Sequence, residues 1–386
     1  MTMQTSAVQP LVATTPSVLG IPVDVSTLST VQARALTKLQ EIVDAGQARA
    51  AAGLDALTQE WNIRRDRMVR AADLDVEVTD GKLGVIIAGE KLALTDHARG
   101  QLLDRALVPA RFAETLLDRD LGALLRQNIR ELLPKANTSI LVRDVATTVK
   151  GILSSSYRRM DAAPVFDAFL RTCMGLGLAP HAALVTDSRA FVSFVWPAIV
   201  DLGGGEFVVL GLELRASDYG RGALELALVV IRLLCLNGMV GSGLLRRVHL
   251  GRRFDGEFGD GGVIELSNRT VNLDVATLKS AVADAVKGAQ RFRETLTKTL
   301  REKVADTKVN LEQVLGSLKS KGFKKELLDR VKATYEAPMP IEALPQVSGG
   351  WRLSNTLSLL AHGAKGDEAK DLQDAAWDVV MPGRLE

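Results

Sequence analysis

The sequence is poor in aromatic residues and in cysteine. Phe, Trp and Tyr make up only 4% of its 386 residues. Few rings are therefore available to stack on bases or sugars, which argues against a lectin, and the core must come from Leu, Val, Ile and Ala. Cys173 and Cys235 lie far apart without a CxxC motif, and the four histidines are scattered. This pattern predicts neither a zinc site nor a disulfide framework.

No segment has the pattern of a signal peptide or of a membrane span. Residues 1–26 lack a basic stretch followed by an apolar block, and no run approaches about 18 uninterrupted apolar residues. The apolar segment 223–240 comes closest, but Glu225, Arg232 and Asn237 interrupt it. We expect a soluble protein of the reducing cytoplasm.

The common motifs of enzymes are also missing. Residues 84–92 approach the phosphate-binding motif GxxxxGK(S/T), but a glutamate is inserted and the hydroxyl residue is replaced by leucine. The segments Gly175–Gly177 and Gly241–Gly243 lack the third glycine of a dinucleotide fingerprint. The GxSxG motif of hydrolases is absent. We predict a protein without catalytic residues, bound metal or cofactor.

Basic residues are unevenly spread along the chain, although its net charge is only +2. Residues 221–253 hold six arginines against one acid, Glu225, and residues 287–332 hold thirteen basic residues against six acidic ones. Clustered cations in a balanced chain are typical of a surface that binds polyanions. A solvated helix face is the alternative interpretation of the second segment.

The centre of the fold is predicted from residues 206–241. This stretch has the pattern of a strand, a turn and a wholly apolar helix over 223–240, and two β-patterned runs, 181–187 and 190–196, precede it. The sequence predicts an α+β protein, with a central antiparallel sheet, a β-β-β-α core packed on a buried helix, and a helical C-terminal region.

Four regions follow from changes in composition and pattern. They are a flexible tail (1–26), a helical and hairpin region (27–135), the central α+β core (136–270) and a helical region (271–386). In the second region Asp80-Gly81 predicts a type I′ turn within a hairpin over 74–94. In the third, a short strand over 139–143 precedes a predicted helix over 145–154, and a further short strand is predicted over 263–266.

A long helix in the last region has a narrow apolar stripe from Leu278 to Val304. We expect residues 276–305 to mediate self-association into a homo-oligomer.

Arg232 is the one charge in the middle of the predicted apolar helix. A buried charge must be paired, reach the surface or face a ligand. We expect a buried ion pair with Glu225 or with an acid elsewhere, and contact with a ligand is the alternative.

Four segments resemble a family of phage and plasmid-associated proteins known as domain of unknown function number nine-three-two. They are HARGQLLDRALVPARFAETLL (97–117), VRDVATTVKGILSSSYRRMDAAPVFDAFL (142–170), ASDYGRGALELALVVIRLLCLNGMVG (216–241) and GGWRLSNTLSLLAHG (349–363). The family supplies a phage context but no catalytic residues. The predicted β-β-β-α order is also similar to that of single-strand-annealing recombinases of the Rad-fifty-two class, which implies DNA binding in a basic groove of an oligomer without a nucleotide cofactor.

The leading hypothesis is therefore a protein that binds single-stranded DNA and anneals or recombines strands without catalysis or ATP. Rings beside guanidinium groups suit single strands, because cations meet phosphates while bases stack. The candidate nucleic-acid-binding residues are Tyr157, Arg158, Arg159, Tyr219, Arg221, Arg246, Arg247, Arg252 and Arg253.

Two alternatives remain open. The first is a structural or assembly protein of a phage or mobile element in which the basic residues only add solubility. The second is an enzyme acting on nucleic acid, which would need an acidic metal cluster that no spacing in the sequence provides.

Overall fold

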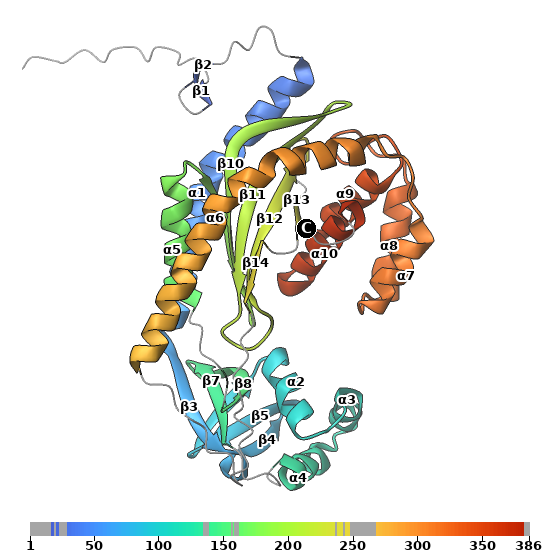
Figure 1. Cartoon of the computed structure of the whole chain (residues 1–386). Helices are drawn as coiled ribbons and strands as arrows, with labels where there is room; N and C mark the ends of the chain where they lie inside the picture. The colour runs from blue at the N-terminus through green and yellow to red at the C-terminus, as the bar shows by residue number, and fades with distance from the viewer. Residues whose placement is uncertain are drawn as a thin grey trace, which may run out of the picture.

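The chain forms two units, each built on a six-stranded sheet (Figure 1). The computed structural model describes residues 17–18, 21–22, 29–133, 139–155, 157, 162–235, 238–241, 244–247 and 268–381. The first unit comprises residues 64–154, and the second comprises the other described helices and the strands from residue 179 onward. Two short strands, β1 (Ser17–Val18) and β2 (Ile21–Pro22), pair with each other. The α+β class predicted from the sequence is confirmed.

The first unit has strand order β3-β7-β8-β6-β5-β4. Its strands are β3 (Arg64–Arg70), β4 (Asp75–Thr79), β5 (Lys82–Ile87), β6 (Glu90–Leu94), β7 (Ser139–Val145) and β8 (Thr148–Ser154). Its α-helices are α2 (Asp96–Arg105), α3 (Ala110–Asp118) and α4 (Gly122–Leu132). Apolar side chains of both sets form one buried cluster. The division expected at residue 135 therefore falls within this sheet, because β7 and β8 complete it.

Local turn chemistry accounts for the hairpins of this unit. Asp80 and Gly81 both have positive φ, 52° and 70°, as a type I′ turn requires, so the predicted hairpin is confirmed. The helix expected over 145–154 is wrong: these residues form β8, paired with β7 across a turn at Ala146. The β-branched Thr148, Val149 and Ile152 favour a strand, and β7 supplies the partner.

The second sheet is an antiparallel meander with order β13-β12-β11-β10-β9, and β14 also pairs with β12. Its strands are β9 (Ala179–Val185), β10 (Ala190–Gly203), β11 (Glu206–Ala216), β12 (Leu224–Arg232), β13 (Gly238–Val240) and β14 (Leu245–Arg247). Its helices are α1 (Thr30–Ile63), α5 (Ala162–Gly175), α6 (Asn268–Ala305), α7 (Leu311–Ser320), α8 (Lys325–Glu336), α9 (Gly350–Ala361) and α10 (Gly366–Val380).

The predicted helix over 223–240 is wrong, and so is the β-β-β-α order. These residues form β12 and β13, so the order is five successive antiparallel strands, β9 to β13. A strand covered on both faces has no apolar–polar alternation, and its sequence then cannot be told from that of a buried helix. Leu226, Leu228 and Val230 join one buried cluster, whereas Ala227 and Val229 join another on the opposite face.

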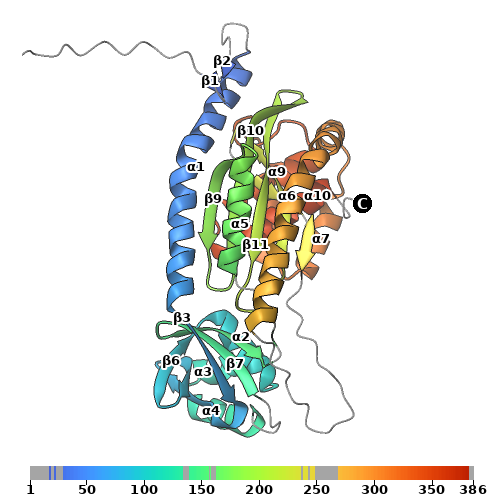
Figure 2. The ribbon, with the colours of Figure 1, turned by 60° about the vertical axis from the view of Figure 1, so that its left-hand side comes forward.

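Helices cover both faces of this sheet. Helix α1 starts at a capping box, in which Ser29 and Gln32 bond each other's backbone, and runs along one face (Figure 2). Helices α5 and α6 cover the other face, and the α9–α10 hairpin packs at the β13 edge. None of the described helices is both long and apolar enough to span a membrane.

The stripe on α6 is confirmed, but it faces inward. Leu278, Val282, Leu296 and Leu300 are all buried in the main core cluster. These side chains belong to the chain's own core, so the self-association expected through residues 276–305 loses most of its apolar surface; Phe292 stays 40% exposed.

A glycine pair tests this packing. A Cβ on Gly241 would lie 2.6 Å from ring atoms of the buried Trp377, whereas a Cβ on Gly288 within α6 would meet no atom within 4 Å. We expect Gly241→Ala to destabilise the protein by about 1–3 kcal/mol through overpacking. Gly288→Ala should stabilise it by about 0.5–1 kcal/mol, because alanine loses less backbone entropy in a helix. Thermal unfolding of both variants measures this, and equal melting temperatures would contradict the packing of α10 on β13.

Candidate nucleic-acid interface

Only part of the predicted binding set lies in the described chain. Arg158, Arg159, Arg252 and Arg253 fall outside the described residues, and only the backbone of Arg247, within β14, is described. Tyr157 precedes α5, Tyr219 and Arg221 lie in the turn between β11 and β12, and the exposed Arg246 lies on β14 opposite Glu225.

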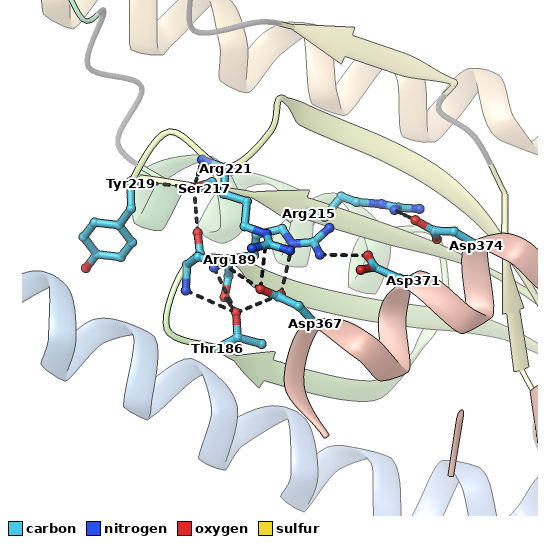
Figure 3. A network of polar contacts seen from close by, with 10 residues as sticks. Thr186, Arg189, Arg215, Ser217, Tyr219, Arg221, Asp367, Asp371 and Asp374 are labelled. Atoms are coloured by element: carbon cyan, nitrogen blue, oxygen red, sulfur yellow. Dashed lines mark hydrogen bonds and ion pairs between the residues drawn. The ribbon is translucent and has the colours of Figure 1, made fainter. Parts of the chain in front are cut away.

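The turn between β11 and β12 is organised by Ser217. Its Oγ donates to the carbonyl of Ser188 at 2.6 Å and accepts from the backbone N–H groups of Tyr219 and Arg221, at 3.2 and 2.9 Å (Figure 3). Gly220, with φ of 81°, lets the backbone reverse where a bulkier residue would be strained. The segment Ser217–Arg221, called the junction turn below, is thereby fixed from within.

Tyr219 is turned into the protein. Only 5% of the residue is exposed, and its hydroxyl donates to Glu60 Oε1 at 2.6 Å. Burial, followed by the charge of Glu60, raises the pKa of Tyr219. The backbone carbonyl of Tyr219 accepts from Gln101 at 2.9 Å and lies 2.8 Å from Nε2 of His97. In this arrangement the ring has no free face to stack on a base.

Tyr157 is held on the other side of the same turn. Its hydroxyl donates to the carbonyl of Ser217 at 3.3 Å, and the guanidinium of Arg143 lies 5.8 Å from its ring centroid. Burial raises the pKa of Tyr157. The ring contacts that the sequence suggested for nucleic acid are thus made inside the chain.

Asp218 connects the two units. Its carboxylate accepts from Arg64 of β3 at 2.7 Å and from the backbone N–H of Ala162 in α5 at 3.1 Å. Its carbonyl accepts from Arg143 of β7 at 2.7 Å, and Arg143 also pairs with Asp66 of β3 at 3.0 Å. Arg143 and the junction turn are therefore structural partners.

Arg221 connects the junction turn to helix α10. Its guanidinium lies 3.4 Å from the carboxylate of Asp367, which also pairs with Arg189 at 3.0 Å. Arg189 contacts Asp371 one turn along α10 at 3.0 Å as well, and Ser188 donates to Asp367 at 2.8 Å (Figure 3). Burial acts to raise the pKa of Asp367, but the Ser188 hydrogen bond and the two arginines outweigh burial, and this pKa is lowered.

The network continues along α10 into a buried layer. Arg215 pairs with Asp374 at 2.7 Å, and Lys370 pairs with Glu213 at 2.5 Å. Oδ1 of Asp374 and Oε1 of Glu213 are buried and have no hydrogen-bond partner in the described part of the chain. Burial raises the pKa of Asp374 to about 6 despite Arg215, and Glu213 adds to the rise. Although 36% of the Asp374 side chain is exposed, its Oδ1 atom is buried, and the burial of this oxygen raises the pKa.

Arg232 forms the expected internal ion pair, but with another acid. It donates to both carboxylate oxygens of Glu206, at 2.6 and 2.9 Å, and to the carbonyl of Ile341 at 2.8 Å. The indole N–H of Trp351 donates to the same carboxylate at 3.2 Å. The alternative of an acid elsewhere in the chain is therefore confirmed, and pairing with Glu225 is wrong, because on a strand the side chains of Arg232 and Glu225 lie on opposite faces.

Exposed cations gather instead at the turn between α7 and α8. Within this basic turn Gly322 has φ of 93°, and one lysine, Lys321, pairs with Asp378 at 2.6 Å. The other exposed cations around this turn have no ion pair in the described part of the chain: Lys319 at the end of α7, Lys324 and Lys325 at the start of α8, and Arg330 further along α8. The sequence signal was the absence of any acid between Glu312 and Glu326.

The outer face of α6 differs from this basic turn. Its exposed Lys287, Arg291 and Lys298 alternate with Glu294 and Glu302, as on a solvated helix. Among the described residues, no three His, Cys, Asp or Glu side chains are placed to hold a metal ion.

Comparison with known proteins adds no relative: no family model, no curated protein and no solved structure matches this chain. The resemblances drawn from the sequence stay predictions.

The raised pKa of Asp374 predicts a pH dependence. Its folded pKa of about 6 lies above the ordinary value of 3.8, so the folded protein binds the extra proton between those values. This group's contribution to stability is therefore fully present below pH 4 and is lost as pH rises through 6. Relative to wild type, Asp374→Asn should gain stability as pH rises from 4 to 6 and change little above 7. Denaturant unfolding of both proteins across this range measures it, and a constant difference would contradict the assignment.

Proposed function

We propose that this protein binds nucleic acid, single-stranded DNA in the first place, through backbone phosphates and without catalysis. The observation that supports this most is the basic turn between α7 and α8. It places Lys319, Lys324 and Lys325 on the surface without an acidic partner in the described chain. Unpaired, clustered cations are what phosphate backbones bind.

The start of α8 strengthens the case. A helix N-terminus carries a partial positive charge and usually attracts acidic residues. Here the N-cap is Lys324, which forms no side-chain cap, and the first helical residue is Lys325; one acid, Glu326, follows in the first turn. Two lysines at this end repel the helix dipole, and a bound phosphate would relieve that repulsion.

Phosphate contacts alone suit strand annealing. Because Tyr157 and Tyr219 are packed around the junction turn, neither ring is free to stack on bases. Bases of a strand held only by its phosphates remain free to pair with a complementary strand. Binding of this kind has a steep salt dependence and little sequence preference.

A role in assembly is the second candidate, favoured by exposed apolar side chains in the first unit. Leu107 is 84% exposed, and Phe112 and Leu124 are each 45% exposed. Large apolar side chains gathered on one small unit are typical of protein contact surfaces.

A matched pair of triple variants tests nucleic-acid binding. We expect Lys319→Ala, Lys324→Ala and Lys325→Ala together to weaken binding of a labelled single-stranded oligonucleotide at low salt. The slope of log K against log salt should fall by about 2, because each phosphate that is no longer neutralised removes about 0.7. The control changes Lys287, Arg291 and Lys298 of α6 to Ala, which removes the same charge.

An unchanged slope in the control with a reduced slope in the α7–α8 variant is the expected result. If both triple variants lose affinity equally, the basic turn is not a binding site. If the wild-type protein binds no oligonucleotide at low salt, the assembly role takes its place.

A further inference from the structure

An open cleft of about 700 Å³ runs between the edge strand β4 and helix α4. Two strand residues, Glu77 and Val78, form one side, and α4 forms the other. The helix residues lining it are Gly122, Ala123, Arg126, Gln127, Arg130 and Glu131. These recur at intervals of about one turn, so the cleft follows a single face of α4 along the strand.

Strand β4 has a free edge along this cleft. Among the described strands it is the last of the first sheet, and it pairs with β5 alone. In a hairpin with a two-residue turn, Thr79 bonds Lys82, so the backbone groups of Val76 and Val78 point away from β5. The N–H of Val76 is already bonded to Asp75 Oδ1 at 2.8 Å. The N–H and carbonyl of Val78 and the carbonyl of Val76 face the cleft side.

The cleft also has a charge preference. Arg126 and Arg130 share one carboxylate, that of Asp75, at 2.8 and 3.3 Å. Nε of Arg126 is buried and has no hydrogen-bond partner in the described chain. Of the two acids that line the cleft, Glu77 is neutralised by Lys91 and Glu131 is exposed at the end of α4. Two guanidinium groups with one carboxylate leave room for a second anion.

The close approach of α4 to β4 sets the width of the cleft at the start of the helix. A Cβ on Gly122 would lie 2.6 Å from Cγ1 of Val78, so only glycine lets the helix start this close to β4. The opposite edge of the sheet is different, because β3 carries Arg64, Arg65, Arg67 and Arg70. Charged edges of that kind discourage strand addition, whereas the two acids of β4, Asp75 and Glu77, are already paired with basic side chains.

We propose that an extended, acidic segment of a partner protein adds to β4 as a further strand and sets an acidic side chain against Arg126 and Arg130. Main-chain bonds to Val78 supply affinity and the arginines supply specificity. This site lies in the first unit, whereas the proposed nucleic-acid surface is on α7 and α8, so neither depends on the other.

The probe is a fluorescein-labelled peptide of alternating valine and glutamate, with alternating valine and lysine as its counterpart. Fluorescence anisotropy with the full-length protein should show binding of the glutamate peptide and about tenfold weaker binding of the lysine peptide. Arg126→Ala with Arg130→Ala should weaken glutamate-peptide binding about tenfold. The control, Arg111→Ala with Arg119→Ala, removes the same charge from exposed positions of the same unit and should leave binding unchanged.

A second variant tests the cleft independently, in case the double arginine variant fails to fold. Ala123→Trp fills the cleft from an exposed position without changing the charge, and should abolish peptide binding while the melting temperature stays near that of wild type. Hydrogen exchange locates the site: the amide of Val78 should exchange quickly in the free protein and become protected with the peptide.

Three results would overturn the proposal. They are equal binding of both peptides, binding that leaves Val78 unprotected, and protection of Val78 that rises with protein concentration without peptide. The last would show that a second copy of this chain occupies the edge.

Discussion

The pairing of Asp218 and its neighbours in the junction turn is the constraint on which the arrangement of the two units depends. Arg64 and Arg143 are both largely buried, and each donates to Asp218. A buried guanidinium without its partner is strongly destabilising, so the first unit must meet the β11–β12 turn of the second. Through Arg221 and Asp367 the same turn also reaches α10. Tyr219 and Arg221, which the sequence suggested as binding residues, thus belong to the turn that connects the two units.

Features specified by neighbours in sequence could be predicted, and features specified across the sheet could not. The Asp80-Gly81 hairpin and the long helix α6 follow from local rules. Strand β12 was mistaken for a helix because helices cover both faces of its sheet and remove the alternation. Arg232 had to be paired, but only the register of β11 and β12 places Glu206 beside it.

Candidate site residues were harder to predict from the sequence, because a tyrosine beside arginines gives the same sequence pattern whether its ring faces solvent or the interior. The hydroxyl of Tyr219 is held inside the protein by Glu60, which lies on α1 far back in the chain. The basic turn of α7 and α8, by contrast, lies within the basic segment 287–332, but the counts for that whole segment did not single out its acid-free stretch 313–325. The proposed nucleic-acid surface thus uses lysines that have no ion pair in the described chain, whereas the proposed peptide surface uses two arginines that share the carboxylate of Asp75.

Hydrogen exchange of the full-length protein, with and without a single-stranded oligonucleotide at low salt, distinguishes a structural junction turn from one that binds ligand, and shows whether the α7–α8 turn is available for ligand. We predict slow exchange over residues 217–221 that DNA leaves unchanged, together with protection over 319–328 on adding DNA. Fast exchange over 217–221 in the free protein, or new protection there with DNA, would contradict it.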